Sequence, residues 1–462
     1  MNPDRLSAET IFALASAPGR AGVAVIRVSG PAAGNVLRDI CGLSAPLEAR
    51  RAIRCRMVEP ASGSALDDGL AIWFAGPASF TGEDVAELHI HGGRATVGAV
   101  TSTLAALPGL RLAEPGEFSK RAFLAGKIDL TEAEAIADLV DAGTDAQRRQ
   151  ALAQLGGGLA DRLEAWRAEL IDILAHTEAW IDFPDEDLPE DVEHAAQARI
   201  SALEGEIRSF LDDNRRGERL RDGLQIAILG APNAGKSSVL NAVAAREAAI
   251  VSATEGTTRD VIEVHLDLGG WPVTIADTAG LRDAADEIER EGVCRALDRA
   301  EAADLRLVVF DASRAPDAAS VAQLSGGAGG SVGGSAGAVL AIANKSDLVD
   351  QPLTAIVGVP ALAISAKTGD GLPELLRRLE GYAADIMAGG EGVPLTRLRH
   401  RVALTDSADA LERAAAVRGG AGDSELVAED LRLAARALGR VTGRVDVEDL
   451  LDVIFNDFCI GK

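Results

Sequence analysis

Cysteines, which can crosslink a chain, and long apolar runs, which can anchor it in a membrane, are scarce in this sequence. Its 462 residues include one tyrosine, three methionines and four cysteines, which are Cys41, Cys55, Cys294 and Cys459. Cysteines this few, without paired spacing, exclude a disulfide framework and a cysteine zinc site, and they fit a reducing cytoplasmic compartment. Because no apolar run reaches about 18 residues and the start lacks a signal-peptide pattern, we expect no membrane partner.

Positive charge is also scarce. The chain has 46 Lys and Arg residues against 71 Asp and Glu, which gives a net charge of −25 at pH 7. This balance excludes a surface generally coated by nucleic acid, although a local basic patch can still bind RNA. The densest basic runs, 215–221 and 397–401, flank the middle of the chain, and we interpret them as charged linker ends rather than an RNA footprint.

A glycine-bounded loop organises the middle of the chain. The apolar run 224–229 precedes GAPNAGKS at 230–237, and a helical pattern follows. Strand, loop and helix in this order predict a P-loop, whose backbone N–H groups and helix start cradle phosphates. We expect Lys236 to reach the β- and γ-phosphates and Ser237 to ligate Mg²⁺. Alone, the loop could be an ordinary glycine-rich turn.

Four further motifs follow in the order that a GTPase requires. The loop EGTTRD at 255–260 contains Thr258, a second hydroxyl ligand for Mg²⁺, and a strand at 271–276 runs into DTAG at 277–280. There the Asp277 carboxylate can hold magnesium through water and Gly280 N–H can meet the γ-phosphate. Another strand ends in NKSD at 344–347, where Asp347 can accept from guanine donors that adenine lacks. We expect residues 365–367, SAK, to close over the base.

These five motifs predict a Ras-like GTPase domain that takes GTP as substrate. The predicted nucleotide contacts are Asn233, Ala234, Gly235, Lys236, Ser237, Ser238, Ser252, Ala253, Thr254, Glu255, Gly256, Thr257, Thr258, Asp277, Thr278, Ala279, Gly280, Asn344, Lys345, Asp347, Ser365, Ala366 and Lys367.

The residue after DTAG is Leu281, where many small GTPases have a glutamine that orients the attacking water. In this respect the domain resembles potassium-dependent GTPases that dimerise across the nucleotide. The resemblance implies a K⁺ site at Asn233, Ser252, Thr254 and Thr257. It also implies that Glu289 positions water. Without the resemblance, Glu289 is one charge on a solvated helix face.

The rest of the chain reads as α/β followed by helical segments. Strands are predicted at 23–29, 69–74 and 85–91, and a helix at 97–107. His89 and His91 share a strand face, but no further ligand completes a metal set, so ordinary strand residues are the favoured interpretation. Helical periodicity covers 131–177, 190–213, 401–417 and 424–455. A Gly/Ser-rich insertion at 325–335 implies no chemistry.

The motifs outside the GTPase part resemble the tRNA-modification GTPases of the MnmE (TrmE) family over the entire chain. They are PGRAGVAVIRVSG at 18–30, FTGEDVAEL at 80–88, HGG at 91–93, EPGEFSKRAFLAGKIDL at 114–130, AIADLV at 135–140 and the ending FCIGK at 458–462. Ala125, where the family commonly has Asn, is a mild departure.

The resemblance implies a multidomain α/β plus α fold. Residues 1–126 would form a tetrahydrofolate-binding α/β domain that makes a constitutive homodimer. Residues 127–217 and 385–462 would form a discontinuous helical domain, and residues 218–384 the inserted GTPase domain. Folate contacts would come from Arg27, Glu87, Lys127 and Lys462: a carboxylate suits a pterin edge and cations suit an anionic tail.

The resemblance also implies a partner, the flavoprotein MnmG (GidA), in a heterotetramer. Together the two proteins would install a carboxymethylaminomethyl or aminomethyl group at carbon 5 of the wobble uridine of certain tRNAs, with a tetrahydrofolate one-carbon donor. Cys459 is a candidate nucleophile toward the pyrimidine ring. The alternative is a positional role for the tail, because no activating neighbour can be read from the sequence.

Two other functions stay open from the sequence. One is an RNA-binding GTPase for ribosome assembly of the Era or Der type, although no GXXG-type RNA module follows the GTPase motifs. The other is a structural dimer with vestigial activity, which the intact motifs disfavour.

Overall fold

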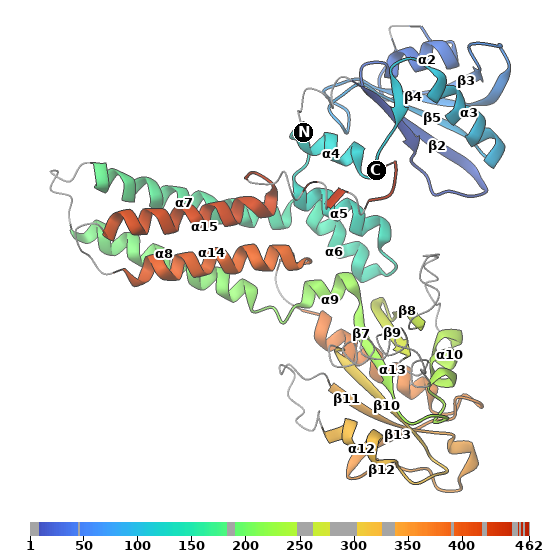
Figure 1. Ribbon diagram of the computed structural model, residues 1–462, viewed down its shortest axis with the longest axis vertical. Coiled ribbons are helices and arrows are strands. Elements are labelled where there is room, and N and C mark those ends of the chain that lie inside the picture. The colour runs from blue at the N-terminus through green and yellow to red at the C-terminus, as the bar shows by residue number, and fades with distance from the viewer. Residues whose placement is uncertain are drawn as a thin grey trace, which may run out of the picture. The chain divides into compact units, whose positions relative to one another are not determined.

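The computed structural model describes residues 9–44, 47–182, 190–246, 262–277, 303–325, 338–389, 392–417, 423–445, 451, 454–455 and 458–461 (Figure 1). The chain divides into two compact units. Unit 1 contains residues 1–137 and 438–462, and unit 2 contains residues 138–437.

Unit 1 is built on a six-stranded sheet with the order β3-β4-β5-β2-β1-β6. Its strands are β1 Thr10–Leu14, β2 Ala21–Ser29, β3 Ala52–Val58, β4 Ala65–Phe74, β5 Val85–Gly92 and β6 Leu110–Leu112. Neighbouring strands are antiparallel, except that β6 runs parallel to β1. The strands predicted at 23–29, 69–74 and 85–91 lie within β2, β4 and β5. The prediction lacked β1, β3 and β6.

Alternation along the central strands separates a core face from a site face. Ile26 pairs with Leu88 across β2 and β5, and both are fully buried with helices α2 (Ala33–Cys41) and α3 (Arg94–Ala106). Arg27 and Glu87, one residue further along, pair on the opposite face. On that face α4 (Glu117–Leu124) buries Phe118.

The last described residues of the chain pack on the N-terminal part of unit 1. Leu130, in helix α5 (Leu130–Asp141), forms a core with Phe455 and Phe458, and Ile460 makes a β-bridge with Pro115. This packing explains why unit 1 includes residues 438–462, whereas the three-part division predicted from the sequence joins them to the helical segments. That three-part division stays a prediction.

Unit 2 contains a group of long helices. They are α7 (Gly158–Asp182), α8 (Glu190–Leu211), α14 (Leu398–Ala416) and α15 (Asp423–Thr442), the last shared with unit 1, and they lie side by side in Figure 1. Arg208 of α8 binds Asp409 of α14 at 3.0 Å, and Arg432 of α15 binds Glu178 of α7 at 2.8 Å. Helices from both ends of unit 2 therefore pack together.

Between these helices in sequence lies a seven-stranded sheet with the order β12-β13-β11-β10-β7-β9-β8. The strands are β7 Leu224–Leu229, β8 Ile262–Leu268, β9 Trp271–Asp277, β10 Leu305–Asp311, β11 Ala338–Asn344, β12 Ala355–Ile356 and β13 Val359–Ala363. β7, β9, β10, β11 and β13 are parallel. Helices α10 (Lys236–Arg246) and α13 (Leu372–Met387) pack into one core with the sheet, while α12 (Ala318–Ser325) packs into another.

The segments that enter and leave this sheet share one anchor. Arg221, at the end of α9 (Arg216–Asp222), binds Asp138 at 3.0 Å, and Arg397 binds the same carboxylate at 2.8 Å. The Asp138 side chain is only 9% exposed. Removing one partner of such a group is costly because a buried charge is left less compensated.

Among the described residues, no helix is both long enough and apolar enough to span a bilayer.

The docking of the C-terminal residues in unit 1 predicts a specific intolerance at Gly116. Its φ is +64°, and an added Cβ would lie 2.6 Å from the Phe455 carbonyl oxygen. We expect Gly116→Ala to lower the free energy of unfolding by more than the roughly 1–3 kcal/mol of backbone strain alone. Urea unfolding measures this.

The control is Gly126→Ala, where φ is +65° but nothing lies within 4 Å of an added Cβ. This variant bears the strain without the collision. Equal destabilisation by the two substitutions would contradict the packing of Phe455 on Gly116.

Candidate functional site

The loop between β7 and α10 closes against the NKSD motif at the end of β11. Gly235 has a φ of +93°, and an added Cβ would lie 2.3 Å from the Asn344 amide nitrogen. Only glycine allows this close approach. The Lys236 ammonium is largely buried and donates to the carbonyls of Gly230 and Ala231, both at 2.9 Å. The loop thus has the strand–loop–helix form that the sequence predicts, with its lysine folded over the loop.

The side-chain amide of Asn344 joins three of the predicted motifs. Its Nδ2 donates to the Ala234 carbonyl at 2.9 Å, and its Oδ1 accepts from the Ala366 N–H at 3.1 Å. Asn344 is 1% exposed, so both bonds are shielded from water. P-loop, base-selecting motif and closing motif therefore meet at one buried group.

Asp347 is oriented by the closing motif. Its Oδ1 accepts from the Ser365 hydroxyl at 2.6 Å, and Ser365 Oγ in turn accepts from the Thr368 N–H at 3.1 Å. Ser365 is fully buried, which fixes the donor. A carboxylate held in this way is prepared to accept two donors from a guanine edge.

The sequence reasoning missed one residue of this site, Asp311 at the end of β10. Lys345 Nζ donates to the Asn233 carbonyl and to Asp311 Oδ2, both at 2.7 Å, so Asp311 holds the lysine over the P-loop. Burial raises the pKa of Asp311, but hydrogen bonds from Lys345 and Ser313 outweigh it and lower the pKa to about 2. A carboxylate at the end of an apolar strand, beside another strand that carries a motif, is the signal that would have revealed it.

Other predicted residues are placed only in part. Ser237 and Ser238 lie exposed in the first turn of α10, and Asp277 ends β9 beside Ile228 of β7. Lys367 lies in the closing motif. Outside the described residues lie Ser252, Ala253, Thr254, Glu255, Gly256, Thr257, Thr258, Thr278, Ala279, Gly280, Glu289 and Lys462. The Mg²⁺ and K⁺ ligand sets and the fourth folate contact therefore stay predictions.

In unit 1 the structure brings together two of the predicted folate contacts. Arg27 Nε donates to Glu87 Oε1 at 3.0 Å, and Arg27 Nη2 lies 3.0 Å from the same oxygen. His89 Nε2 lies 3.5 Å from the other carboxylate oxygen. His91 instead binds Asp67 at 2.8 Å, and the described residues contain no group of three or more His, Cys, Asp or Glu placed to hold a metal. Cys459 is exposed.

Most arginines of the two basic runs form ion pairs within the chain. Arg219 binds Asp304 at 2.7 Å, and Arg401 binds Asp213 at 2.6 Å and Glu218 at 3.0 Å. Together with the pairing of Arg221 and Arg397 to Asp138, these contacts favour charged linker ends over an RNA footprint.

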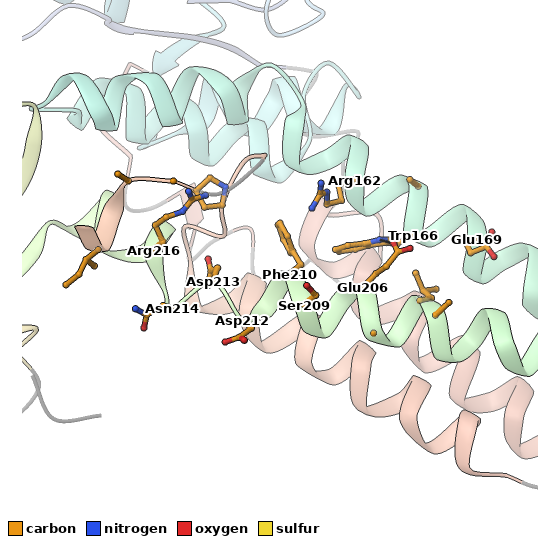
Figure 2. Close-up of a pocket in the computed structure, with 18 of the residues that line it drawn as sticks. Arg162, Trp166, Glu169, Glu206, Ser209, Phe210, Asp212, Asp213, Asn214 and Arg216 are labelled. Atoms are coloured by element: carbon orange, nitrogen blue, oxygen red, sulfur yellow. Dashed lines mark hydrogen bonds between the residues drawn. The ribbon is translucent and has the colours of Figure 1, made fainter. Parts of the chain in front are cut away.

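A hollow of about 1260 Å³ in unit 2 contains none of the predicted site residues (Figure 2). Trp166 Nε1 donates to Glu206 Oε2 at 3.1 Å, and Arg162 lies 5.0 Å from the centroid of the Phe210 ring. Its lining mixes both signs of charge, so it has no clear preference for an anionic nucleotide.

Comparison with known proteins decides the family. The family model described as GTP-binding protein TrmE N-terminus matches residues 10–127, and that described as MnmE helical domain matches residues 130–459. The chain is 57% identical over 457 residues to a tRNA modification GTPase MnmE of Paramagnetospirillum magneticum, covering 98% of this chain and 100% of that protein. The chain belongs to the MnmE family.

One further relative and one solved structure are also similar to the chain. A tRNA modification GTPase MnmE of Rhodospirillum rubrum is 54% identical over 473 residues, covering 99% of this chain and 100% of that protein. A solved structure of Era from Aquifex aeolicus matches 40% of this chain and 66% of its own at 23% identity, and its TM-score of 0.27 carries no argument. The family assignment favours MnmE over the Era or Der type.

The position of Asp311 in this MnmE-family chain predicts a pH dependence. A carboxyl whose pKa falls from 3.8 to about 2 on folding stabilises the folded state above the unfolded pKa, and this stabilisation is lost as pH falls through the folded pKa. We expect Asp311→Asn to cost about 1–2 kcal/mol of unfolding free energy at pH 7, and the difference to shrink between about pH 4 and pH 2. Chemical unfolding at several pH values measures it.

Asp317→Asn, at the start of α12, is a control away from the P-loop, because the pKa of that carboxyl is lowered by Ser320 and not by a lysine. Asp311→Asn, but not Asp317→Asn, should also weaken GDP binding. A GDP affinity unchanged by Asp311→Asn would contradict its role in holding Lys345.

Proposed function

We propose that this chain hydrolyses GTP in the service of tRNA modification. The observation that supports GTP binding is the buried Asn344 amide, because it joins the P-loop, the base-selecting motif and the closing motif into one site. Full-length relatives at 57% and 54% identity, named as tRNA modification GTPases, support the role of the hydrolysis.

The proposed chemistry assigns a task to each of the predicted residues. Lys236 would leave the loop carbonyls for the β- and γ-phosphates, and Asp347 would read the guanine edge. Ser237, with Thr258, would hold Mg²⁺, which when bound neutralises phosphate charge. Ser237 is an exposed residue at the start of α10, which fits that ligand role.

Potassium is the proposed substitute for a missing catalytic group. Leu281 cannot orient the attacking water as a glutamine would. Some group must also neutralise the negative charge that develops on the phosphates, and we assign this role to K⁺. Asn233 has a φ of +63°, and its carbonyl accepts a hydrogen bond from Lys345, which fixes its backbone. The residue is exposed, so its side chain can reach an ion. With Ser252, Thr254 and Thr257 it would hold K⁺ when two GTPase domains meet, and Glu289 would position water.

The remaining steps rest on unit 1 and on partners. Arg27, Glu87, Lys127 and Lys462 would bind a tetrahydrofolate one-carbon derivative in a homodimer. A heterotetramer with the flavoprotein MnmG would then form the carboxymethylaminomethyl or aminomethyl group at carbon 5 of the wobble uridine. The paired Arg27 and Glu87 side chains support this site, because they present a cation and a carboxylate together.

We also propose the three-part arrangement. Residues 218–384 form the GTPase domain, inserted between 127–217 and 385–462 of one helical domain. The shared anchor of Arg221 and Arg397 on Asp138 supports it, because both connecting segments are tied to one helix. Cys459 stays a candidate nucleophile.

The potassium proposal is tested by GTP hydrolysis rates in KCl and NaCl at equal ionic strength. We expect hydrolysis to be at least about tenfold faster in KCl, because roughly 1.4 kcal/mol less barrier gives that factor. Asn233→Ala should remove the difference, and Lys236→Ala should abolish hydrolysis in both salts.

Two controls separate ion binding from backbone strain. Asn233→Gly removes the side chain but accepts the positive φ, so it should lose the potassium effect equally. Asn241→Ala, at an exposed position of α10, should keep it. Equal rates in the two salts, or full stimulation in both Asn233 variants, would refute a potassium site at Asn233.

A further inference from the structure

The loop between β4 and β5 is fastened on both sides of Phe80. Gly76 N–H donates to Asp84 Oδ1 at 2.9 Å, and the Ser79 hydroxyl donates to the Glu83 carbonyl. On the other side, the Thr81 and Ser29 hydroxyls are 2.7 Å apart. The side chains that flank Phe80 are turned inward, since Ser79 and Thr81 are 9% and 1% exposed.

A buried ion cluster anchors the same loop to α4. Glu83 accepts from the Ser29 hydroxyl at 2.7 Å and from Arg121 Nη1 at 3.0 Å. Arg121 is 4% exposed and also binds Glu117 at 2.9 Å. Burial raises the pKa of Glu117, but bonds from Arg111, the Glu114 N–H and Arg121 outweigh it, so the pKa is lowered and Glu117 stays charged. The loop backbone is therefore held rigidly.

Phe80 projects from this fixed loop toward the Arg27–Glu87 pair. The Arg27 guanidinium carbon lies 5.9 Å from the Phe80 ring centroid and 5.7 Å from that of Phe118. The two rings differ in burial: Phe118 is fully buried, whereas Phe80 is 37% exposed. Single exposed apolar residues are common, but here the exposed ring borders a paired cation and carboxylate and its backbone is fixed.

The loop also lies beside Lys127, the second positively charged side chain that is predicted to contact the folate. A Cβ added to Gly82 would lie 3.4 Å from Lys127 Cε, so the stem of this lysine runs beside the loop. One fastened loop thus lies beside both Arg27 and Lys127, which places its exposed aromatic ring within the group of residues assigned above to the folate.

We propose that Phe80 is a stacking residue, on which the planar heterocycle of the ligand lies while Glu87 reads its N–H edge. This inference rests on the proposed folate function. Arg27 Nε and Nη2 both lie 3.0 Å from Glu87 Oε1, and His89 Nε2 is 3.5 Å from Oε2, which is beyond a strong hydrogen bond. Oε2 therefore keeps acceptor capacity for a ring N–H or amino group.

Stacking on a rigid aromatic ring favours flat π-systems and costs little conformational entropy, because the loop is ordered before the ligand arrives. For nucleobases, such stacking is worth about 1–3 kcal/mol. Loss of the Phe80 ring should therefore weaken binding of a pterin-bearing ligand by roughly tenfold or more.

The experiment measures binding of 5-formyltetrahydrofolate to the full-length protein by calorimetry. We expect Phe80→Leu to raise the Kd by roughly tenfold or more and Phe80→Tyr to stay near the wild type. The Kd of p-aminobenzoylglutamate, which lacks the pterin, should change little in Phe80→Leu. Leu112→Ala, an exposed apolar residue on β6, is the matched control and should bind like the wild type. Thermal unfolding should be the same in all of these variants, and Leu112→Ala should also hydrolyse GTP like the wild type.

The outcomes separate this inference from the function beneath it. If the wild type binds the folate and Phe80→Leu binds it equally well, stacking is wrong and the folate function stands. If Phe80→Leu weakens both ligands equally, Phe80 does not stack on the pterin and the inference is also overturned. If the wild type does not bind although it hydrolyses GTP, the folate function fails and the inference fails with it. Glu87→Gln tests the function itself and should reduce folate binding.

Discussion

The buried side-chain amide of Asn344 is the interaction on which the nucleotide site depends. It donates to the P-loop and accepts from the closing motif, although these partners lie more than 100 and about 20 residues away in sequence. A buried amide without hydrogen-bond partners destabilises the folded state. The three segments therefore have to come together for the fold to be stable. Gly235 belongs to the same constraint, because any larger residue would displace the amide.

The same principle operates in the other parts of the chain. In unit 1, buried Arg121 binds Glu83 and Glu117, and it thereby fixes the loop that presents Phe80. In unit 2, Asp138 joins the two segments that enter and leave the sheet. In both places a charged group that needs partners holds together segments that are distant in sequence. Exposed residues near Arg121, such as Phe80, then acquire fixed positions, which is what a binding site requires.

Sequence patterns predicted those elements whose structure depends on neighbouring residues in the chain. Glycine spacing and an apolar run were enough for the P-loop, and alternation was enough for β2, β4 and β5. Arg27 and Glu87 were predicted as one site only through the family resemblance, because their pairing depends on the register of two strands. Asp311, Arg121 and the packing of Phe455 on Gly116 were not foreseen, since each role comes from a contact between distant segments. The basic runs, read as linker ends, bind carboxylates within the chain.

The central claim is that this chain uses GTP hydrolysis to support modification of tRNA. The most direct measurement is a mass-spectrometric nucleoside profile of tRNA from cells that lack the protein. The account predicts loss of the wobble uridines substituted at carbon 5, with recovery by the intact gene but not by Lys236→Ala. An unchanged tRNA profile, with ribosomal RNA precursors accumulating instead, would contradict it.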